Sequence, residues 1–590
     1  MLQLASKTYH PLKCTMVRPS RPCTSLINMP FLLSGLSRPS LPSMVASPPS
    51  AYSRYASKAE PPRADLPAPL VHHLGTGWHA QQRPRLVILG TGWAATSIIK
   101  QLHSSAYEII VFSPKNYFVF TPLLPGATTG TVEPRSLLES IRKICYKSGA
   151  RYIQANAQDV DFNKKQITFT DPNGPNFLIS YDKLVVAVGA RNETYGIPGV
   201  HEHVHFLKSI QDSLRIRAKI MQLFESASVP NISIEEKKKL LNFVIVGGGP
   251  TGVEFAAELF DFLDRDMIKF FPDLLQSFVR ITIIQGSGHV LNTFDIAISK
   301  YTENRFKRQN INVVTNSFVI SVDKDRIVYK CRDPDTGNDI LHEINYGLCV
   351  WSTGIAMHDF TKRLAAMTDR QKITHALCVD SHLRIKGVRD VYALGDCATI
   401  RTPNILDIVN ESLSKQESDT LSIVDFDRIT KEIMDQHPQT RALLLPLCRK
   451  IHASGKPEEV LTLNIKDIKE KLAVIDKNIT LLPATAQVAS QQGRYLAKKL
   501  NTLSKYDQAD WYEKEDRMKP FVYRHLGSFS YVGHESTVFD SGTGWTTGGF
   551  GAWFLWRSAY LSRQVSLRTR VLLAWDWTKT FVFGRDISKI

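Results

Sequence analysis

Two short stretches decide the fold of this chain: RLVILGTGWAA at residues 85–95 and FVIVGGGPTGVE at residues 243–254. Each is an apolar run that leads into glycines and then into a helical pattern. In a dinucleotide-binding fold the first glycine allows a tight turn and the second lets the backbone approach a pyrophosphate. A third small residue lets helix and strand pack closely. One such stretch is a weak signal, but two predict an α/β protein with two Rossmann-like dinucleotide-binding domains.

The charge of the chain is unevenly distributed. The net charge is +17 over 590 residues, yet the first 59 residues hold seven Lys or Arg and no Asp or Glu. A basic, acid-poor and Ser-rich start is typical of a mitochondrial transit peptide, which we assign to residues 1–60. An ordinary disordered tail is the alternative. Lys and Arg gather at the two chain ends and not along one aromatic-rich face, so we expect no nucleic-acid partner.

The cysteines and the hydropathy exclude several classes of protein. The eight cysteines form no C-x-x-C or similar spacing, so the sequence predicts no zinc cluster, no redox dithiol and no other metal site. Flavoprotein disulfide reductases need two cysteines a few residues apart, so this class is also disfavoured. The chain has no run of 18 apolar residues, and we therefore expect no transmembrane helix.

Further apolar runs outline the domains. The runs at 107–113 and 181–190 continue the first nucleotide-binding domain, and the runs at 279–285 and 311–315 continue the second. A strand at 347–354 is expected to close the second domain, after which the chain returns to the first. The transit peptide is expected at 1–60, the first domain at 82–240 and the second at 241–346. The chain then returns to the first domain at 347–404 and continues through an insert at 405–475. A further helix of the first domain is expected at 476–520 and a C-terminal region at 521–590.

The returning segment carries its own signal, Gly395 followed by Asp396. A strand there delivers a carboxylate to a glycine-hinged turn, where it can accept hydrogen bonds from sugar or ribitol hydroxyls. The alternative is an Asp that caps the N-terminus of a helix. Both roles are compatible with one residue.

Four segments identify a family. They are NYFVFTPLLP at 116–125, LPATAQVASQQG at 482–493, RSAYLS at 557–562 and FGRDIS at 583–588. With these segments the chain resembles the type II NADH:quinone oxidoreductases, the single-subunit alternative NADH dehydrogenases of fungal, plant and bacterial respiratory membranes. The resemblance covers about residues 84–590 apart from the insert. It implies that the first domain binds FAD and the second binds NADH or NADPH.

The resemblance also implies roles for particular residues. The residues expected to bind FAD are Gly90, Gly92, Ala95, Thr121, Pro122, Leu123, Gly189, Gly395 and Asp396. Those expected to bind NAD(P)H are Gly247, Gly249, Gly252, Gln285 and Gly354. Glu254 resembles the acidic residue that the family places near the nicotinamide. Its alternative role is a glutamate in the first turn of a helix, where the helix dipole favours it.

Gln285 stands where the second strand of the NAD(P)H domain ends. A carboxylate there would bind both ribose hydroxyls of NADH and repel the 2′-phosphate of NADPH, whereas an amide carries no such repulsion. We therefore hypothesise that NADPH is accepted and is a candidate for the preferred donor. An NADH enzyme that has lost one contact is the alternative.

Gln487 and Gln491 lie four residues apart on an expected helix and so face the same way. In the resembling family such glutamines lie beside the flavin and the quinone pocket, where an amide can bond a quinone carbonyl. Two exposed helix glutamines are the alternative. Gln487, Gln491 and Glu254 are thus the candidate catalytic residues for hydride transfer through FAD to ubiquinone.

The C-terminal region mixes aromatic and basic residues from residue 553 onward. Tyr560, Leu567, Val571 and Trp575 recur at helical spacing, which predicts one interfacial helix on an anionic membrane, with Arg568 snorkelling from that face. A dimerisation helix is the alternative, and a homodimer is expected.

The insert at 405–475 resembles the calcium-hand insert of some externally facing members. In TLSIVDF at 420–426 the last ligand would be Asp425, but the earlier ligand positions hold Ser414, Gln416 and Ser418, and Asp419 replaces the required glycine. Calcium needs several carboxylates, so we expect no useful calcium affinity.

These expectations together describe a peripheral flavoenzyme of the mitochondrial inner membrane, with the intermembrane-space face favoured, that passes electrons from NAD(P)H to ubiquinone without pumping protons. Two alternatives remain. One is a signalling flavoprotein that binds both cofactors without turning over quinone. The other is an enzyme like sulfide:quinone reductase, although Cys145 and Cys331 form no convincing pair.

Overall fold

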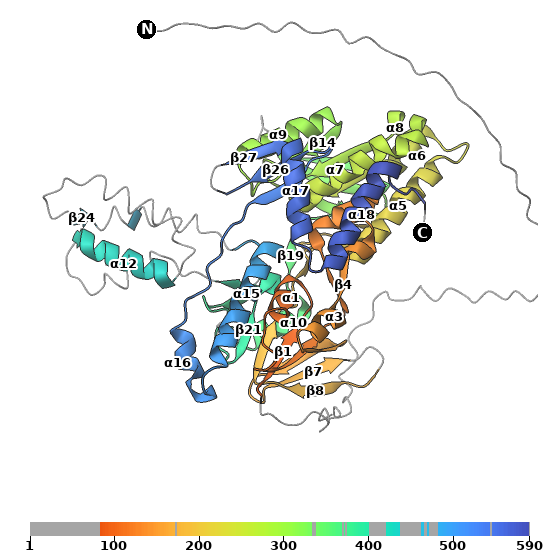
Figure 1. Ribbon diagram of the computed structural model, residues 1–590. Helices are drawn as coiled ribbons and strands as arrows, with labels where there is room; N and C mark the ends of the chain where they lie inside the picture. Colours follow the sequence, from red (N-terminus) through yellow and green to blue (C-terminus); the bar gives the residue numbers. More distant parts are fainter. Residues whose placement is uncertain are drawn as a thin grey trace, which may run out of the picture. The chain divides into compact units, whose positions relative to one another are not determined.

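The computed structural model describes residues 83–170, 174–332, 338–368, 371, 375–400, 420–436, 462–464, 469–470, 482–542 and 545–588. The transit peptide expected at residues 1–60 lies outside these ranges. The described part contains two parallel sheets that are flanked by helices (Figure 1). The predicted α/β class with two Rossmann-like domains is therefore confirmed.

The first parallel sheet holds the first glycine-rich stretch. Its five strands, in spatial order, are β21 (Val391–Ala393), β9 (Lys183–Val186), β1 (Arg85–Leu89), β2 (Glu108–Phe112) and β5 (Arg151–Ile153). The central strands are buried on both faces, as continuous apolar runs in a covered parallel sheet should be. Because β21 pairs with β9, the chain does return to the first sheet after the second has been built. One face carries α1 (Trp93–Ile99), which packs against α15 (Ala486–Leu503).

The second parallel sheet repeats the same plan. Its strands, in spatial order, are β11 (His205–Phe206), β18 (Leu348–Trp351), β12 (Asn242–Val246), β13 (Arg280–Ile284) and β14 (Ile311–Val314). Its helices include α5 (Ile210–Ala227), α7 (Pro250–Arg265) and α9 (Ile296–Arg308). Two boundaries need correction. β18 pairs with β12, so the second domain extends past residue 346, and the return to the first begins after β18. β11 pairs with β18, so the second domain also includes residues before 241.

Two antiparallel sheets and a short ribbon extend the parallel ones. One antiparallel sheet, in the first domain, consists of β6 (Asn156–Asp161), β7 (Gln166–Thr170) and β8 (Phe177–Ser180). The other, in the second domain, consists of β15 (Ser317–Val322), β16 (Arg326–Arg332) and β17 (Asp339–Asn345). The ribbon of β3 (Tyr117–Val119) and β4 (Leu138–Ser140) brackets η1 (Thr121–Leu123) and α2 (Leu124–Thr129). Helix α2 packs against both α5 and α7 and so connects the two nucleotide-binding domains.

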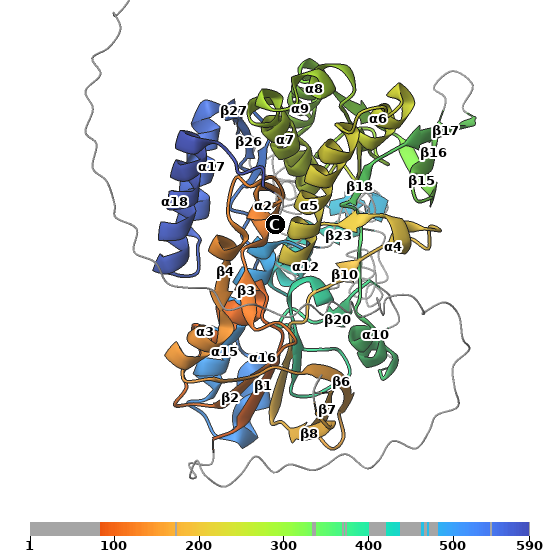
Figure 2. The same ribbon diagram turned by 90° about the vertical axis from the view of Figure 1, so that its right-hand side faces the viewer.

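The C-terminal region forms a small sheet and two helices. The elements are β25 (Ser528–Tyr531), β26 (Thr537–Asp540), β27 (Thr546–Gly549), α17 (Phe550–Ser562) and α18 (Leu567–Phe583). Helices α17 and α18 lie side by side along one edge of the molecule (Figure 2). None of the helices in the described residues is long and apolar enough to cross a membrane.

The single apolar face predicted from Tyr560 to Trp575 is wrong in detail, because the helix ends at Ser562 and a new one starts after Ser566. Ser566 and Thr569 form a capping box that fixes this new start. Tyr560 turns inward, with its ring 5.7 Å from that of Phe120. Arg568 does not snorkel from an apolar face: its Nη1 donates to the Leu138 carbonyl at 3.1 Å.

Within the insert the structure describes β23 (Thr420–Ser422), α12 (Ile423–Gln436) and β24 (Thr462–Asn464). β23 pairs antiparallel with β24, a strand that the sequence analysis did not single out. The Asp425 carboxylate accepts hydrogen bonds from the Ser422 hydroxyl at 2.8 Å and from Arg428 at 3.0 Å. The other expected ligand positions, Ser414, Gln416, Ser418 and Asp419, lie outside the described residues, and the calcium expectation stays a prediction.

Candidate functional site

The first cradle, Gly90, Gly92 and Ala95, closes the turn between β1 and α1. Gly90 has φ +112°, and a Cβ there would lie 2.2 Å from the Ala187 carbonyl oxygen. Gly92 is the N-cap of α1 without a side-chain cap, and a Cβ there would meet no heavy atom within 4 Å. The first amides of α1 therefore face open space, as binding of a pyrophosphate requires.

The second cradle, Gly247, Gly249 and Gly252, has the same construction between β12 and α7. Gly247 has φ +109°, and Gly249 is the uncapped N-cap with open space beside it. A Cβ on Gly252 would lie 2.0 Å from the Gly247 carbonyl oxygen, so only glycine fits there. Both cradles thus fit a dinucleotide.

The carboxyl ends of the two sheets meet. After β9 the chain passes Gly189 into β10 (Arg191–Asn192), and after β18 it passes Gly354 into β19 (Ile355–Ala356). β10 and β19 pair antiparallel, and the Trp351 indole N–H donates to the Glu193 carbonyl at 2.9 Å. Since ligands of parallel α/β sheets bind beyond the carboxyl ends of the strands, the two cradles open toward a shared region.

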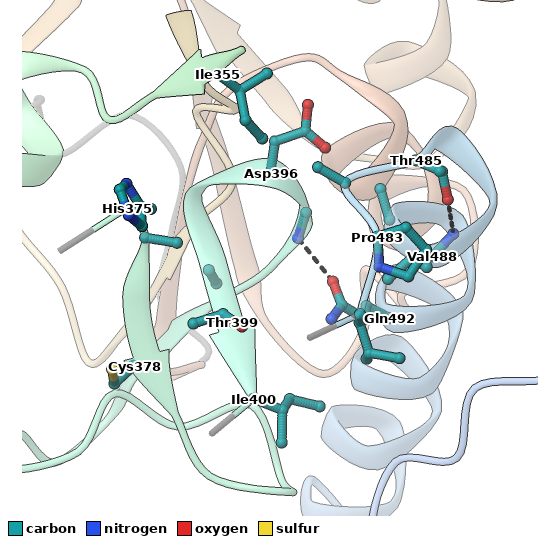
Figure 3. Close-up of a pocket in the computed structure, with 16 residues that line it drawn as sticks. Ile355, His375, Cys378, Asp396, Thr399, Ile400, Pro483, Thr485, Val488 and Gln492 are labelled. Atoms are coloured by element: carbon teal, nitrogen blue, oxygen red, sulfur yellow. Dashed lines mark hydrogen bonds between the residues drawn. The ribbon is translucent and has the colours of Figure 1, made fainter. Parts of the chain in front are cut away.

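Asp396 lies in η4 (Gly395–Cys397), directly after β21. The Gly395 N–H donates to the Gln492 side-chain oxygen at 2.7 Å, which ties this turn to α15 (Figure 3). A cavity of about 320 Å³ opens beside Asp396, between β22 (Ala398–Ile400) and the start of α15. Its walls are mostly apolar and include Val488, Pro483 and Ile400. Gln492 was missed because it belongs to the buried face of its helix, where an amide carries no sequence signal.

Thr121, Pro122 and Leu123 form η1, which leads into α2. The Trp93 indole N–H, from the start of α1, donates to the Thr121 hydroxyl at 2.9 Å. This bond places the segment next to the start of α1 and so next to the first cradle.

Gln487 and Gln491 lie on one face of α15, and both side chains bond the segment 523–527. Gln487 Oε1 accepts from the Tyr523 hydroxyl and the Leu526 N–H, each at 2.8 Å. The Gln491 amide pairs with the backbone of Arg524 in both directions, at 2.7 and 3.0 Å. Neither glutamine is a freely exposed helix residue. Each amide nitrogen carries two N–H groups, and the bonds among the described residues use one of them, toward the Gly527 carbonyl for Gln487 and the Arg524 carbonyl for Gln491.

Gln285 directly follows β13 and caps the second cradle. Its Oε1 accepts from the Gly248 N–H at 2.8 Å, and its Nε2 donates to the Ser287 hydroxyl at 2.5 Å. The amide therefore holds the glycine turn without placing a charge at the edge of the cradle.

Glu254 lies in the first turns of α7, 6% exposed. Its Oε1 accepts from the Tyr531 N–H of β25 at 3.3 Å. Burial, with a smaller contribution from the charge of Glu258, raises the pKa of the Glu254 carboxyl to about 8. Glu254 can therefore hold a proton at neutral pH, which an exposed glutamate of a first helical turn would not do.

Two facing dinucleotide cradles, with a carboxylate turn beside the first, define a two-dinucleotide flavoprotein. Residues 84–415 match the family model for pyridine nucleotide-disulphide oxidoreductases, and residues 525–586 match that for the NDH2 C-terminal domain. The chain belongs to the alternative, type II NAD(P)H-ubiquinone oxidoreductases.

Individual relatives match this chain over most of their own length. An external alternative NAD(P)H-ubiquinone oxidoreductase B3 of Arabidopsis thaliana mitochondria is 39% identical, over 86% of this chain and 91% of its own. External NADH-ubiquinone oxidoreductase 2 of Saccharomyces cerevisiae mitochondria is 32% identical, over 86% and 82%. The structure of NDH2 from Plasmodium falciparum in complex with NADH aligns with a TM-score of 0.75 and 31% identity, over 86% of this chain and all of its own.

A sulfide:quinone oxidoreductase of Aquifex aeolicus aligns with a TM-score of 0.55 at 14% identity, over 85% of this chain and 96% of its own, which shows a shared fold alone. None of the five cysteines of the described residues forms a disulfide, and four of them are buried. Burial raises the pKa of the Cys145 thiol to about 12, so this cysteine is no reactive thiolate.

Proposed function

We propose that this protein oxidises NADH and NADPH by way of FAD and reduces ubiquinone at the mitochondrial inner membrane, as a respiratory entry point that moves no protons across the membrane. The observation that carries the proposal is the pairing of β10 with β19, which brings the carboxyl ends of both sheets together. A hydride donor in the second cradle then faces a flavin in the first. Such positioning is the main contribution of a protein to cofactor chemistry.

The residues have the following roles. Gly90, Gly92 and Ala95 hold the FAD pyrophosphate, and Asp396 accepts hydrogen bonds from the ribitol. When bound, FAD supplies the acceptor for the hydride and the donor of two electrons to quinone. Glu254 holds a proton on its carboxyl, and that proton is available because burial keeps the group neutral. A quinone that takes two electrons needs two protons, of which the hydride brings one.

Pro122 and Leu123 are assigned to the flavin ring with Thr121, and Gly189 and Gly395 to the backbone around FAD. Gly247, Gly249 and Gly252 hold the NAD(P)H pyrophosphate, with Gly354 beside them.

Gln487 and Gln491 form the quinone-side wall by holding segment 523–527, and the second N–H of each amide can donate to a quinone carbonyl. Replacing Gln487 by Ala should raise KM for quinone while flavin reduction by NADH stays unchanged. Equal losses in both half-reactions would contradict this assignment. Lys498→Ala, on the same helix, is the matched control.

Gln285 supports acceptance of NADPH, because its side chain is neutral and bonded to Gly248. The ratio of kcat/KM for NADPH and NADH measures this directly. A strong preference of the protein for NADH would contradict it.

Helices α17 and α18 support membrane attachment. They expose a set of apolar side chains, each at least 40% accessible: Phe550, Phe554, Leu555, Leu567, Val571, Trp575, Phe581, Val582 and Phe583. Apolar area of this kind binds the interface of a bilayer. Val571→Ser should weaken binding to anionic vesicles roughly fivefold, equivalent to about 1 kcal/mol of lost apolar burial. Ile340→Ser, at an exposed site on β17, should leave vesicle binding unchanged. Equal effects of both variants would contradict the assignment.

The intermembrane-space face is favoured, because the relatives named external share the sequence over 86% of this chain. Intact mitochondria that carry the protein should then oxidise added NAD(P)H without permeabilisation. The same apolar surface also suits a homodimer, which light scattering in detergent will reveal.

Anaerobic stopped-flow measurement tests the activity itself. Flavin absorbance should bleach with NADH or NADPH and recover when a short-chain ubiquinone is added. Bleaching without recovery would instead indicate a signalling flavoprotein.

A further inference from the structure

Three carboxylates lie on one side of α7 and are buried under the C-terminal region. Glu254, Glu258 and Asp261 follow the helical spacing of four and three residues, and they are 6%, 5% and 0% exposed. Burying carboxylates this deeply is costly unless hydrogen bonds and opposite charges compensate. The partners of each carboxylate therefore matter for what it does.

Glu258 is compensated by Arg585, which lies in the tail after α18. One guanidinium nitrogen of Arg585 is 3.3 Å from Glu258 Oε2, and the other is 3.0 Å from Asp266 Oδ2. Arg585 Nε donates to the Thr131 hydroxyl at 2.9 Å, and that hydroxyl donates to Glu258 at 2.5 Å. Arg585, Glu258 and Asp266 each have side chains 7% exposed, so the set is shielded from water.

A second arginine approaches from α17. The Arg557 guanidinium lies 4.0 Å from the Trp553 ring centre and 4.8 Å from that of Trp577. These rings contact the cation. Burial lowers the pKa of the Arg557 guanidinium to about 10, and the negative charge of Glu258 opposes that shift. Arg585 thus pairs with Glu258 and Asp266, and Arg557 adds a second positive charge that interacts with Glu258.

Glu254 has no such cation. Its hydrogen bond among the described residues is the one from the Tyr531 N–H. Asp261, by contrast, accepts from the Tyr531 hydroxyl and the His534 N–H. The titratable groups that interact with Glu254 are Glu258 from α7 and Tyr560 from α17, beside the Tyr531 N–H of β25. Arg557 of α17 and Arg585 of the tail interact with Glu258, and Arg585 also interacts with Asp261.

We propose that Glu258 and Arg585 are positioning residues for quinone reduction: as a paired, buried set they fix the charge beside Glu254, so that Glu254 keeps the proton that quinol formation needs. The step is balanced. NAD(P)H gives two electrons and one proton as hydride, the O–H bond of Glu254 breaks, and an O–H bond of the quinol forms. Water then returns a proton to Glu254. This inference rests on the proposed function.

The two partners should act in opposite directions. The negative charge of Glu258 disfavours ionisation of Glu254, and the positive charge of Arg585, which is paired with Glu258, offsets that effect. Because the protonated form of Glu254 is the active one, quinone reduction should fall as pH rises through its pKa. Glu258→Gln should therefore move this fall to lower pH, and Arg585→Gln should move it to higher pH. Each shift should be about one pH unit, because about 1.4 kcal/mol of interaction with one charge corresponds to one pKa unit.

The experiment is stopped-flow on the full-length holoenzyme with ubiquinone-1, from pH 5.5 to 9.5. Flavin reduction by NADH and flavin reoxidation by quinone are followed separately for the wild type, Glu258→Gln, Arg585→Gln and Arg585→Lys. Arg585→Lys retains the charge and should restore the wild-type midpoint. Asp264→Asn, at an exposed position of the same helix, is the matched control and should leave the midpoint unchanged.

Opposite shifts confined to reoxidation support the inference. Shifts in the same direction, or losses of rate with no shift, would show that the pair is merely structural and overturn it. If one Gln variant loses its flavin, the midpoint of the other Gln variant decides, and an unshifted midpoint there overturns the inference. Quinone turnover by the wild type without any fall at high pH would overturn the inference but leave the proposed function intact. No turnover at all would overturn the proposed function itself.

Discussion

The two nucleotide cradles share one backbone plan but differ in how tightly it closes. Gly90 and Gly247 have φ +112° and +109°, and each donates its N–H to the end of the neighbouring strand, at 2.8 and 2.9 Å. The third small position differs, because the first cradle accommodates the methyl of Ala95 while the second has no room for one at Gly252. The two similar glycine-rich sequences therefore pack helix against strand differently, with more room between β1 and α1 than between β12 and α7.

The largest effect should come from Gly90→Ala. The added Cβ would meet the Ala187 carbonyl at 2.2 Å in a left-handed backbone conformation, so the turn cannot keep its shape. Since a bound cofactor stabilises the folded state, the variant should lose most of its FAD and unfold at lower temperature. The ratio of flavin absorbance to protein measures this. Gly551→Ala, where α17 offers open space, is the control. A flavin-replete Gly90→Ala protein would contradict the role of the first cradle.

Gly252→Ala should affect the second cradle and leave the first unchanged. Its Cβ would lie 2.0 Å from the Gly247 carbonyl oxygen, and overpacking of this kind costs about 1–3 kcal/mol. The variant should retain FAD but be reduced by NADH roughly 10- to 100-fold more slowly at limiting donor concentration. Loss of FAD together with donor binding would mean that the cradles do not act independently.

Gln285→Glu tests what stands at the edge of the second cradle. A carboxylate there would still accept from the Gly248 N–H, but it would repel a 2′-phosphate. The kcat/KM for NADPH should fall by about tenfold or more, since each 1.4 kcal/mol of repulsion gives tenfold, while that for NADH changes little. Gln285→Asn, which stays neutral, is the control. An unchanged donor ratio would show that discrimination lies elsewhere.

Much of this comparison was available from the sequence. The glycines and the apolar runs at 85–89 and 242–246 are local signals, because a strand buried on both faces must be apolar throughout. Asp396 was predicted as a cofactor residue in the same way, from an expected strand that ends in Gly-Asp, and the structure places it in the turn after β21. Such local features also identified the family, which the relatives confirmed.

The remaining features depend on contacts between distant segments. The hydrogen bond between Arg585 and Glu258 joins residues 327 positions apart, and the sequence around either residue does not predict it. Gln487 was expected beside a quinone, but its bonds to segment 523–527 depend on how the chain folds back. The break between α17 and α18 was missed because the apolar spacing continues across it, while Ser566 as a cap outweighs that spacing.

Ala95→Gly should give the smallest effect and test the comparison from the other side. If the first cradle truly has room at its third position, removing the methyl leaves a small gap and no clash. The variant loses the burial of one methyl group and places a glycine inside α1, which together cost about 1–2 kcal/mol. Thermal unfolding should shift by a few degrees, with FAD content and NADH reduction near wild type. A loss of FAD as large as that in Gly90→Ala would show that the Ala95 methyl itself sets the helix–strand distance, and then the two cradles would be equally tight.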